Sequence, residues 1–203
     1  MVFRPTEKKE RALGVKLLLK ASRCASPKCA MIRRPFKPGI HGNKKGGRRK
    51  ESSEFGKQLQ EKQKVQFSYG LNNNQMRRLF RSKNQTEAIL ELLEKRLDNV
   101  IFRLGLADSR VIARQLINHG HFFVNDRKMA VPSYLVRIGD KISLNANSRK
   151  LKIFENLESK LKKNETLNWL KLDKEKLIGE LIDKPQEINL PFDLNLVAEY
   201  YSR

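Results

Sequence analysis

The spacing of apolar residues changes near the middle of the chain. In TEAILELLEKRLDNVIFRLG they recur every one, three or four positions, which predicts one helix, or two helices if the chain kinks near Asn99. Ser109 can cap a further helix, RVIARQLINH, which Gly120 would end. After Gly120 the apolar residues alternate through HFFVN, SYLVR and KISL, which is typical of short antiparallel strands. The change predicts an α+β unit of two helices and a small antiparallel sheet over residues 96–150.

Helical signals dominate the remainder of the chain after a loop-rich start. We expect helices near 8–20, from Ser52 or Ser53 to about Tyr69, from Asn73 or Asn74 through MRRLF, over 148–170, and in a short final segment that contains LVAEYYSR. Trp169, Tyr200 and Tyr201 are expected to be core aromatics, with base stacking as the alternative.

The charge is the second strong constraint. The 203 residues carry 43 Lys and Arg against 22 Asp and Glu, a net charge of +21, which is more than solubility requires. Residues 1–64 hold 19 basic and 5 acidic residues, 96–150 hold 10 and 4, and 151–203 hold 9 and 10. A polyanion releases its counterions when it neutralises such charge, so the first two segments predict a nucleic-acid surface. A membrane partner is not expected, because no apolar run approaches about 20 residues.

Motifs for catalysis are missing from the sequence. It contains no GxxxxGK[ST] loop, no GxSxG elbow and no HExxH. His119 and His121 flank Gly120 without a neighbouring acidic pair, so we interpret them as polar or phosphate-facing residues and not as metal ligands or bases. The sequence therefore predicts a protein that is not an enzyme.

Both cysteines lie in one stretch, RCASPKCAMIRRPFKPGIHG. Cys24 and Cys29 could belong to a metal site, a disulfide, a redox pair or a loop that merely retains two thiols. Their spacing is not that of a CxxC redox motif, and a chain with two cysteines and no signal-peptide pattern is expected in a reducing, cytoplasmic compartment, which disfavours a disulfide. A structural zinc ion is bound by four ligands, so the two thiols are weak candidates for zinc ligands and zinc is not expected.

The segment RLDNVIFRLGLADSRVIARQLINHGHFFVNDRKMAVPSYLVRIGDKISL resembles the S-four RNA-binding domain. The stretches EFGKQLQEKQKVQFSYGLNNNQMRRLF and LVAEYYSR, together with the cysteine stretch, extend the resemblance over nearly the whole chain. The chain resembles the bacterial-type small-subunit ribosomal proteins of the S-four family. For the fold, the resemblance implies a mostly helical first domain with the RNA-binding domain inserted. We therefore expect a basic extension over 1–50, a helical domain over 51–95 and 151–203, and the RNA-binding domain over 96–150.

For function, the resemblance implies a structural constituent of the small ribosomal subunit. Such proteins bind the ribosomal RNA of that subunit early in assembly, lie near the messenger RNA entry channel, support translational accuracy and contact the neighbouring S-five family ribosomal protein. Some members repress their own messenger. The alternatives are a free-standing regulator of its own messenger, and an RNA-modifying enzyme that uses the S-four domain as a grip. The sequence leaves open whether the ribosome is cytoplasmic in a bacterium or belongs to an organelle.

The predicted contacts to ribosomal RNA are mostly cations, because structured RNA is recognised through its shape and phosphates. They are Lys44, Lys45, Arg48, Arg49 and Lys50 in a glycine-rich loop, Lys57, Lys62 and Lys64 on a helix, Arg110, Arg114 and His119 on the capped helix, and Lys128 at the hairpin. A disordered basic tail is the alternative for the loop. The family usually has Asn-Gly at the hairpin turn, where this chain has Asn125-Asp126, and the acidic side chain puts close RNA contact there in doubt.

The resemblance also bears on the cysteines. Some members of the family have four cysteines in two pairs that bind zinc near the N-terminus, and Cys24 and Cys29 match the second pair. Glu7 and Glu10 occupy the positions of the first pair, and His41 is a weak substitute. The resemblance therefore implies that the cysteine stretch retains only one of the two cysteine pairs of such a zinc site.

Overall fold

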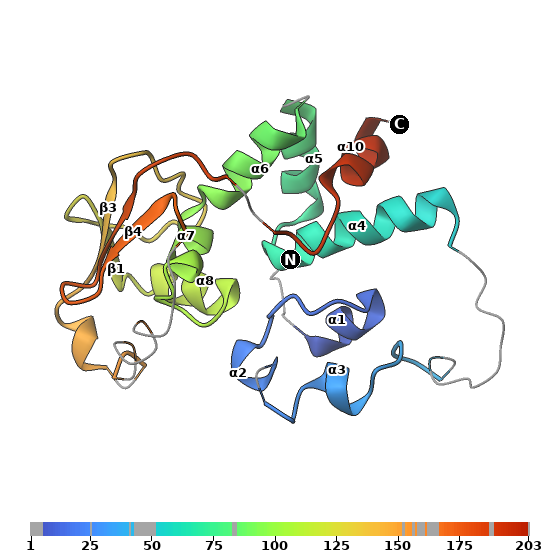
Figure 1. The fold of residues 1–203 in the computed structure, drawn as a ribbon, viewed down its shortest axis with the longest axis horizontal. Coiled ribbons are helices and arrows are strands. Elements are labelled where there is room, and N and C mark those ends of the chain that lie inside the picture. The colour runs from blue at the N-terminus through green and yellow to red at the C-terminus, as the bar shows by residue number, and fades with distance from the viewer. Residues whose placement is uncertain are drawn as a thin grey trace. The chain divides into compact units, whose positions relative to one another are not determined.

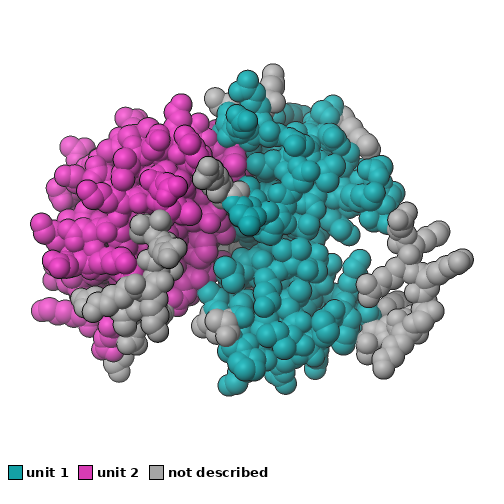
Figure 2. All heavy atoms as spheres, viewed as in Figure 1, with its two compact units in different colours: residues 1–89, 189–203 teal, residues 90–188 magenta. Residues whose placement is uncertain are grey.

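The computed structural model describes residues 6–24, 26–40, 42, 52–82, 85–151, 153–155, 157, 161, 167–186 and 189–202. Two compact units make up the chain (Figure 2). Unit 1 comprises residues 1–89 and 189–203, and unit 2 comprises residues 90–188.

Unit 1 is helical in its described part (Figure 1). Its elements are α1 (Glu7–Leu13), α2 (Ala21–Cys24), α3 (Ala30–Arg33), α4 (Glu54–Ser68), α5 (Asn73–Ser82), the first part of α6 (Thr86–Glu94) and α10 (Leu194–Ser202). The end of the chain returns to this unit because α10 packs against α4 and α5. Gln58 Nε2 donates to Glu199 Oε2 at 2.9 Å, and the rings of Phe80 and Tyr201 stack at 5.2 Å.

Local signals in the sequence set several of the helix ends in unit 1. The predicted cap Ser53 accepts a hydrogen bond from Gly56 N at 3.2 Å and begins α4. The cap of α5 is Asn72 and not Asn73 or Asn74, since Asn72 Oδ1 accepts from Gln75 N at 2.7 Å. The helix predicted to reach residue 20 ends at Leu13, because Gly14 adopts a left-handed φ of 71°.

In its described residues, unit 2 combines helices with a five-stranded antiparallel sheet in the order β2-β1-β3-β5-β4. Its elements are the end of α6, α7 (Leu97–Arg103), α8 (Arg110–Asn118), β1 (Phe122–Val124), β2 (Arg127–Lys128), β3 (Lys141–Leu144), the 3-10 turn η1 (Ser148–Lys150), β4 (Leu170–Asp173) and β5 (Ile178–Leu181). The α+β fold class predicted from the change of period is therefore confirmed.

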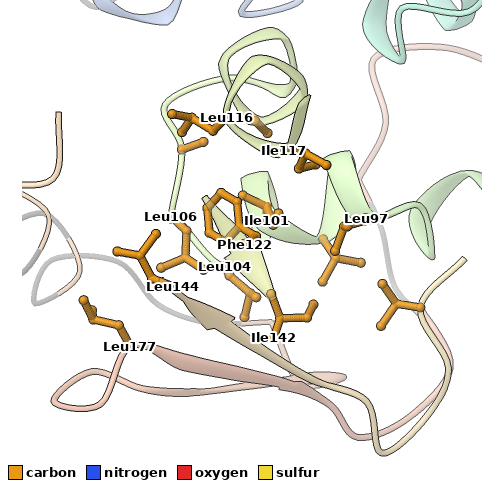
Figure 3. Close-up of a cluster of buried hydrophobic side chains, with 14 of the residues drawn as sticks. Leu97, Ile101, Leu104, Leu106, Leu116, Ile117, Phe122, Ile142, Leu144 and Leu177 are labelled. Carbon is orange, nitrogen blue, oxygen red and sulfur yellow. The ribbon is translucent and has the colours of Figure 1, made fainter. Parts of the chain in front are cut away.

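A single apolar cluster joins the helices of unit 2 to its sheet (Figure 3). The helices supply Leu97, Ile101, Leu116 and Ile117, the residue after α7 supplies Leu104, and the strands supply Phe122, Ile142 and Leu144. Alternate residues of β3 are buried, as expected for a strand with one covered face. Gly179 in β5 lies so near the cluster that a Cβ there would come within 2.4 Å of Leu104 Cδ1.

The predicted helix boundary near Asn99 is displaced. The α6–α7 division falls at Lys95 and Arg96, where the backbone pairs with another segment: Leu97 N donates to Tyr134 O and Val136 N donates to Lys95 O, both at 2.8 Å. The expected strand SYLVR is reduced to an isolated bridge between Arg96 and Leu135. The long-range pairing thus interrupts the helix at a position that periodicity does not mark.

The C-terminal quarter differs most from the prediction. Residues 170–181 form the hairpin β4–β5 and extend the sheet through β3, so they belong to unit 2 and not to the helical domain. The helix predicted over 148–170 is wrong at both ends, which are a 3-10 turn and a strand. Residues 1–50 likewise form no separate unit, because they lie with α4 and α5 in unit 1. None of the helices in the described residues is long and apolar enough to cross a membrane.

Candidate nucleic-acid interface

Helix α8 presents the two arginines that the sequence singles out. Ser109, the predicted cap, is buried and accepts a hydrogen bond from Ile112 N at 3.2 Å, which fixes the start of the helix. Ala113, Leu116 and Ile117 face the core. Arg110 and Arg114 are one turn apart and therefore share another face of α8.

A buried carboxylate on α7 holds Arg114. Asp98 accepts hydrogen bonds from Arg114 Nη2 at 2.7 Å and from Arg114 Nε at 3.2 Å. It also accepts from Arg96 Nε at 3.1 Å and Arg96 Nη2 at 2.9 Å. Asp98 therefore pairs with its neighbour Arg96 and also reaches across to α8. Two guanidinium groups around one carboxylate leave a net positive charge at this place, and the Arg114 side chain keeps 28% of its surface exposed.

A second buried carboxylate organises Arg103 and Arg110. Glu94 is fully buried and accepts from Arg103 Nε at 3.0 Å and Arg103 Nη2 at 3.1 Å. Asn99 donates from Nδ2 to Glu94 Oε2 at 2.8 Å, and its Oδ1 accepts from Arg110 Nε at 2.7 Å. The Arg110 guanidinium lies 4.6 Å from the centre of the Phe102 ring. Arg96, Arg103 and their acidic partners therefore belong to the site, although they are absent from the contacts predicted from the sequence.

A basic patch lies where α8 ends and β1 begins. Gly120 has a left-handed φ of 73°, and a Cβ there would meet Lys128 Cε at 2.1 Å, so the Lys128 chain lies directly over this glycine. The exposed His119 ring is 6.1 Å from the His121 ring. His121 Nδ1 and Ser148 Oγ are hydrogen-bonded at 2.8 Å. Burial, helped by the charges of His119 and Lys128, lowers the pKa of His121, which keeps its ring neutral near pH 7.

The hairpin turn is strained at two non-glycine residues. Asn125 and Asp126 have φ values of 49° and 62°, as a two-residue turn of this kind requires. Asn125 is held in place because its Nδ2 donates to Asp140 Oδ1 at 2.8 Å and its Oδ1 accepts from Lys141 N at 2.9 Å. Asp126 is exposed, so its negative charge faces the solvent beside β2.

The three lysines predicted on α4 have different environments. Lys57 is exposed and pairs with Glu54 at 2.8 Å, and Lys64 pairs with Glu61. Lys62 is only 8% exposed: its Nζ donates to Asn73 Oδ1 at 2.8 Å and lies over the Tyr200 ring at 5.7 Å. Burial and the bond to Asn73 set Lys62 apart from Lys57, and the predicted contact of Lys62 with RNA stays a prediction.

Several predicted residues lie outside the described part of the chain. The glycine-rich loop residues are among them: Lys44, Lys45, Arg48, Arg49 and Lys50. Their contact with RNA stays a prediction that rests on the sequence alone.

The cysteine stretch packs around a carboxylate. Cys24 and Cys29 are buried free thiols. Glu10 is 1% exposed, and its Oε1 accepts from Leu17 N at 2.9 Å and Leu19 N at 3.2 Å. Cys24 Sγ donates to Glu10 Oε2 at 3.8 Å. Burial raises the pKa of Cys24 to about 11, and the charge of Glu10 acts in the same direction, so the thiol stays protonated near pH 7.

This donor set does not suit a structural zinc ion. Structural zinc is usually bound by four ligands, most often cysteine thiolates and histidines. Here Glu10 already accepts hydrogen bonds from two backbone amides, and Glu7 lies 3.1 Å from Arg23 Nε. Within the described residues, no group of three or more His, Cys, Asp or Glu side chains is arranged to hold a metal ion. His41 lies outside those residues. The expectation that the protein carries no zinc remains a prediction.

Comparison with known proteins gives two family matches that together cover residues 2–142. Residues 2–97 match the family described as ribosomal protein S4/S9 N-terminal domain, and residues 95–142 match the S4 domain. The second match covers α7, α8, β1, β2 and the start of β3, which are the elements that carry the arginine network and the basic patch.

Relatives match over almost the whole chain. A small ribosomal subunit protein uS4 from Syntrophomonas wolfei is 44% identical over 200 residues, covering 95% of this chain and 94% of the relative. The uS4 protein of Thermus thermophilus is 45% identical over 201 residues with the same coverage, and that of Gloeobacter violaceus is 46% identical over 200 residues. The chain therefore belongs to the uS4 family of small ribosomal subunit proteins and contains the S4 domain of that family.

Proposed function

We propose that this protein is a structural constituent of the small ribosomal subunit and binds the RNA of that subunit directly. The observation that carries the proposal is the arginine pair on the capped helix α8, Arg110 and Arg114, inside a domain that matches the S4 domain. Arg96, Arg103 and Arg114 contact the two buried carboxylates, and Arg110 contacts the neutral amide of Asn99, so the four arginines outnumber these two carboxylates, which suits the phosphates of structured RNA.

The finer parts of the role follow from the family resemblance. The protein nucleates assembly by binding its RNA early, lies near the messenger entry channel, supports accuracy and contacts the neighbouring S-five family ribosomal protein. Its place is the ribosome, in the cytoplasm, and it acts by binding and not by catalysis. The length of the match supports this proposal, since 95% of the chain aligns with relatives named as ribosomal proteins.

Binding of the full chain to small-subunit ribosomal RNA tests the proposal. We expect a clear preference for that RNA over unrelated RNA of equal length. The logarithm of the binding constant should fall linearly with the logarithm of salt concentration, with each phosphate contact adding roughly 0.7 to 0.9 to the slope. An affinity that barely changes with salt, or no preference between the two RNAs, would contradict the proposal.

Two double variants test whether the α8 arginines form the RNA-binding surface. Replacing Arg110 and Arg114 by alanine should weaken binding and reduce the salt slope by about 2. The matched control replaces Lys171 and Lys174, which are exposed cations on β4 and the turn after it, and removes the same charge. Equal losses in the two double variants would show that net charge matters and that the α8 surface does not. Cosedimentation of tagged protein with the small subunit tests its place in the ribosome.

A further inference from the structure

The two neighbouring residues Asp98 and Asn99 hold the two arginines of α8 in different ways. Asp98 meets Arg114 with a carboxylate, whereas Asn99 meets Arg110 with a neutral amide oxygen. Asn99 is fully buried, so it contacts no RNA itself. Its amide therefore restricts Arg110 without bringing a counter-charge of its own.

The environment fixes which way the Asn99 amide faces. Its inner end lies 2.9 Å from Glu94 O and 2.8 Å from Glu94 Oε2. A backbone carbonyl and a carboxylate only accept hydrogen bonds, so the NH₂ group must face them and Oδ1 must face Arg110. Glu94 is itself held by Arg103 through two hydrogen bonds. The contacts from Arg103 to Glu94 and from Glu94 to Asn99 thus fix Asn99 Oδ1 as the acceptor of the Arg110 hydrogen bond.

Two contacts on different parts of the guanidinium group restrict Arg110. Asn99 Oδ1 takes the Nε proton at 2.7 Å, and the Phe102 ring lies 4.6 Å from the guanidinium carbon. A hydrogen bond at Nε and an aromatic ring beside the group limit the torsions of a long side chain that is otherwise rich in rotamers.

We infer that Asn99 is a positioning residue for RNA binding, which holds Arg110 in the orientation that meets a phosphate. The inference rests on the proposed function. A side chain that is already ordered loses less entropy when RNA binds, and removal of that restraint corresponds to about a 2- to 10-fold loss of affinity per side chain. The number of phosphate contacts does not change, because Arg110 still reaches its phosphate.

A double-mutant cycle between Asn99→Ala and Arg110→Ala, with the full chain and small-subunit RNA, tests the inference. In the presence of Arg110, Asn99→Ala should weaken binding about 2- to 10-fold with an unchanged salt slope. In the Arg110→Ala background it should have no further effect. Arg110→Ala alone should lower the slope by about 1. Equal losses from Asn99→Ala in both backgrounds, or no loss in either, would overturn the inference.

If Asn99→Ala does not fold, a measurement on the wild-type protein still tests the positioning role. The Nε–H group of Arg110 should exchange slowly with solvent and show restricted motion by NMR, in contrast to that of the exposed Arg127 in β2. Equal mobility of the two groups would refute the positioning role. Failure of the proposed function looks different: Arg110→Ala would then leave RNA affinity and salt slope unchanged, whatever the state of its Nε–H.

Discussion

Lys62 shows how neighbouring residues decide what a cation can do. Its sequence context, between Lys57 and Lys64 on one helix, suggests a surface that faces RNA. In the structure its ammonium group lies under α10, bound to Asn73 and beside the Tyr200 ring. Burial lowers its pKa, and the nearby charge of Arg77 adds to that effect. Lys62 therefore contributes to the packing of unit 1.

Lys62 and Lys57 should therefore respond differently to replacement by alanine. Lys62→Ala removes a buried hydrogen bond and the packing of its aliphatic chain, which we expect to lower the free energy of unfolding by about 1–3 kcal/mol. Lys57→Ala, at an exposed ion pair, should change it by less than about 1 kcal/mol. Urea unfolding measures both. A smaller loss for Lys62→Ala than for Lys57→Ala would contradict its buried role.

The Cys24 thiol predicts a dependence of stability on pH. A thiol in an unfolded chain ionises near a pKa of about 8.5, whereas burial and Glu10 raise the pKa of Cys24 to about 11. The unfolded state therefore loses its proton first. The stabilisation is complete below the unfolded value and is lost as pH rises toward the folded value.

Unfolding curves between pH 8 and 11 should show this loss. The free energy of unfolding of the wild type should fall more steeply over this range than that of Cys24→Ala, which lacks the titrating group but keeps the other ionisable residues. Parallel curves for the two proteins would mean that the folded environment does not hold the proton on Cys24.

At the level of the elements, the helix caps show what a short sequence signal can specify. Ser109 was predicted as a cap and Ser53 was one of two candidates beside Ser52, and each accepts a hydrogen bond from the amide three residues later. Such a bond needs only residues within one turn, so sequence is enough to predict it. The two caps differ in burial: Ser109 is 1% exposed, whereas Ser53 is exposed.

Removing the two caps should therefore have unequal effects. Ser53→Ala removes the acceptor of the Gly56 amide, which is open to water, and should cost about 0.5–1 kcal/mol of stability. Ser109→Ala leaves the Ile112 amide without its partner in a part-buried place and should cost about 1–2 kcal/mol. Chemical denaturation of each variant gives the comparison. Equal costs would show that the burial of the cap does not matter.

For the whole molecule, the pairing of β3 with β5 decides where one unit ends. Residues 170–181 were expected with the helical domain because the family resemblance implies that the C-terminal tail joins that domain. The hairpin instead continues the sheet of unit 2, where Leu177, Leu181 and Gly179 meet the core beneath α7. A boundary drawn at residue 150 would remove two of the five strands and expose Leu104 and Ile142.

Two fragments test that boundary. The fragment 90–188 should unfold cooperatively, because it contains all five strands and their core. The fragment 90–150 should lose cooperativity, since β3 loses its hydrogen-bonded neighbour β5 and the core loses Leu177 and Leu181. Thermal melts followed by circular dichroism distinguish them. A cooperative transition in the shorter fragment would show that the hairpin β4–β5 is dispensable for the fold of unit 2.

The sequence alone determined the features that depend on neighbours along the chain. The helical periods, both serine caps, the α8 arginines and the change to strands after Gly120 are of this kind. So is the excess of positive charge, which is a property of composition. The strained Asn125-Asp126 turn was also visible, because a two-residue hairpin demands left-handed backbone at those positions.

Only the tertiary structure decided which distant groups meet. The division of the helix at Arg96, the addition of β4 and β5 to the sheet, the burial of Lys62 and the hold of Asn99 on Arg110 all join residues that lie on different elements. Local periodicity carries no signal for these pairings. They follow from which apolar faces remain uncovered and which buried polar groups still need partners once the elements pack.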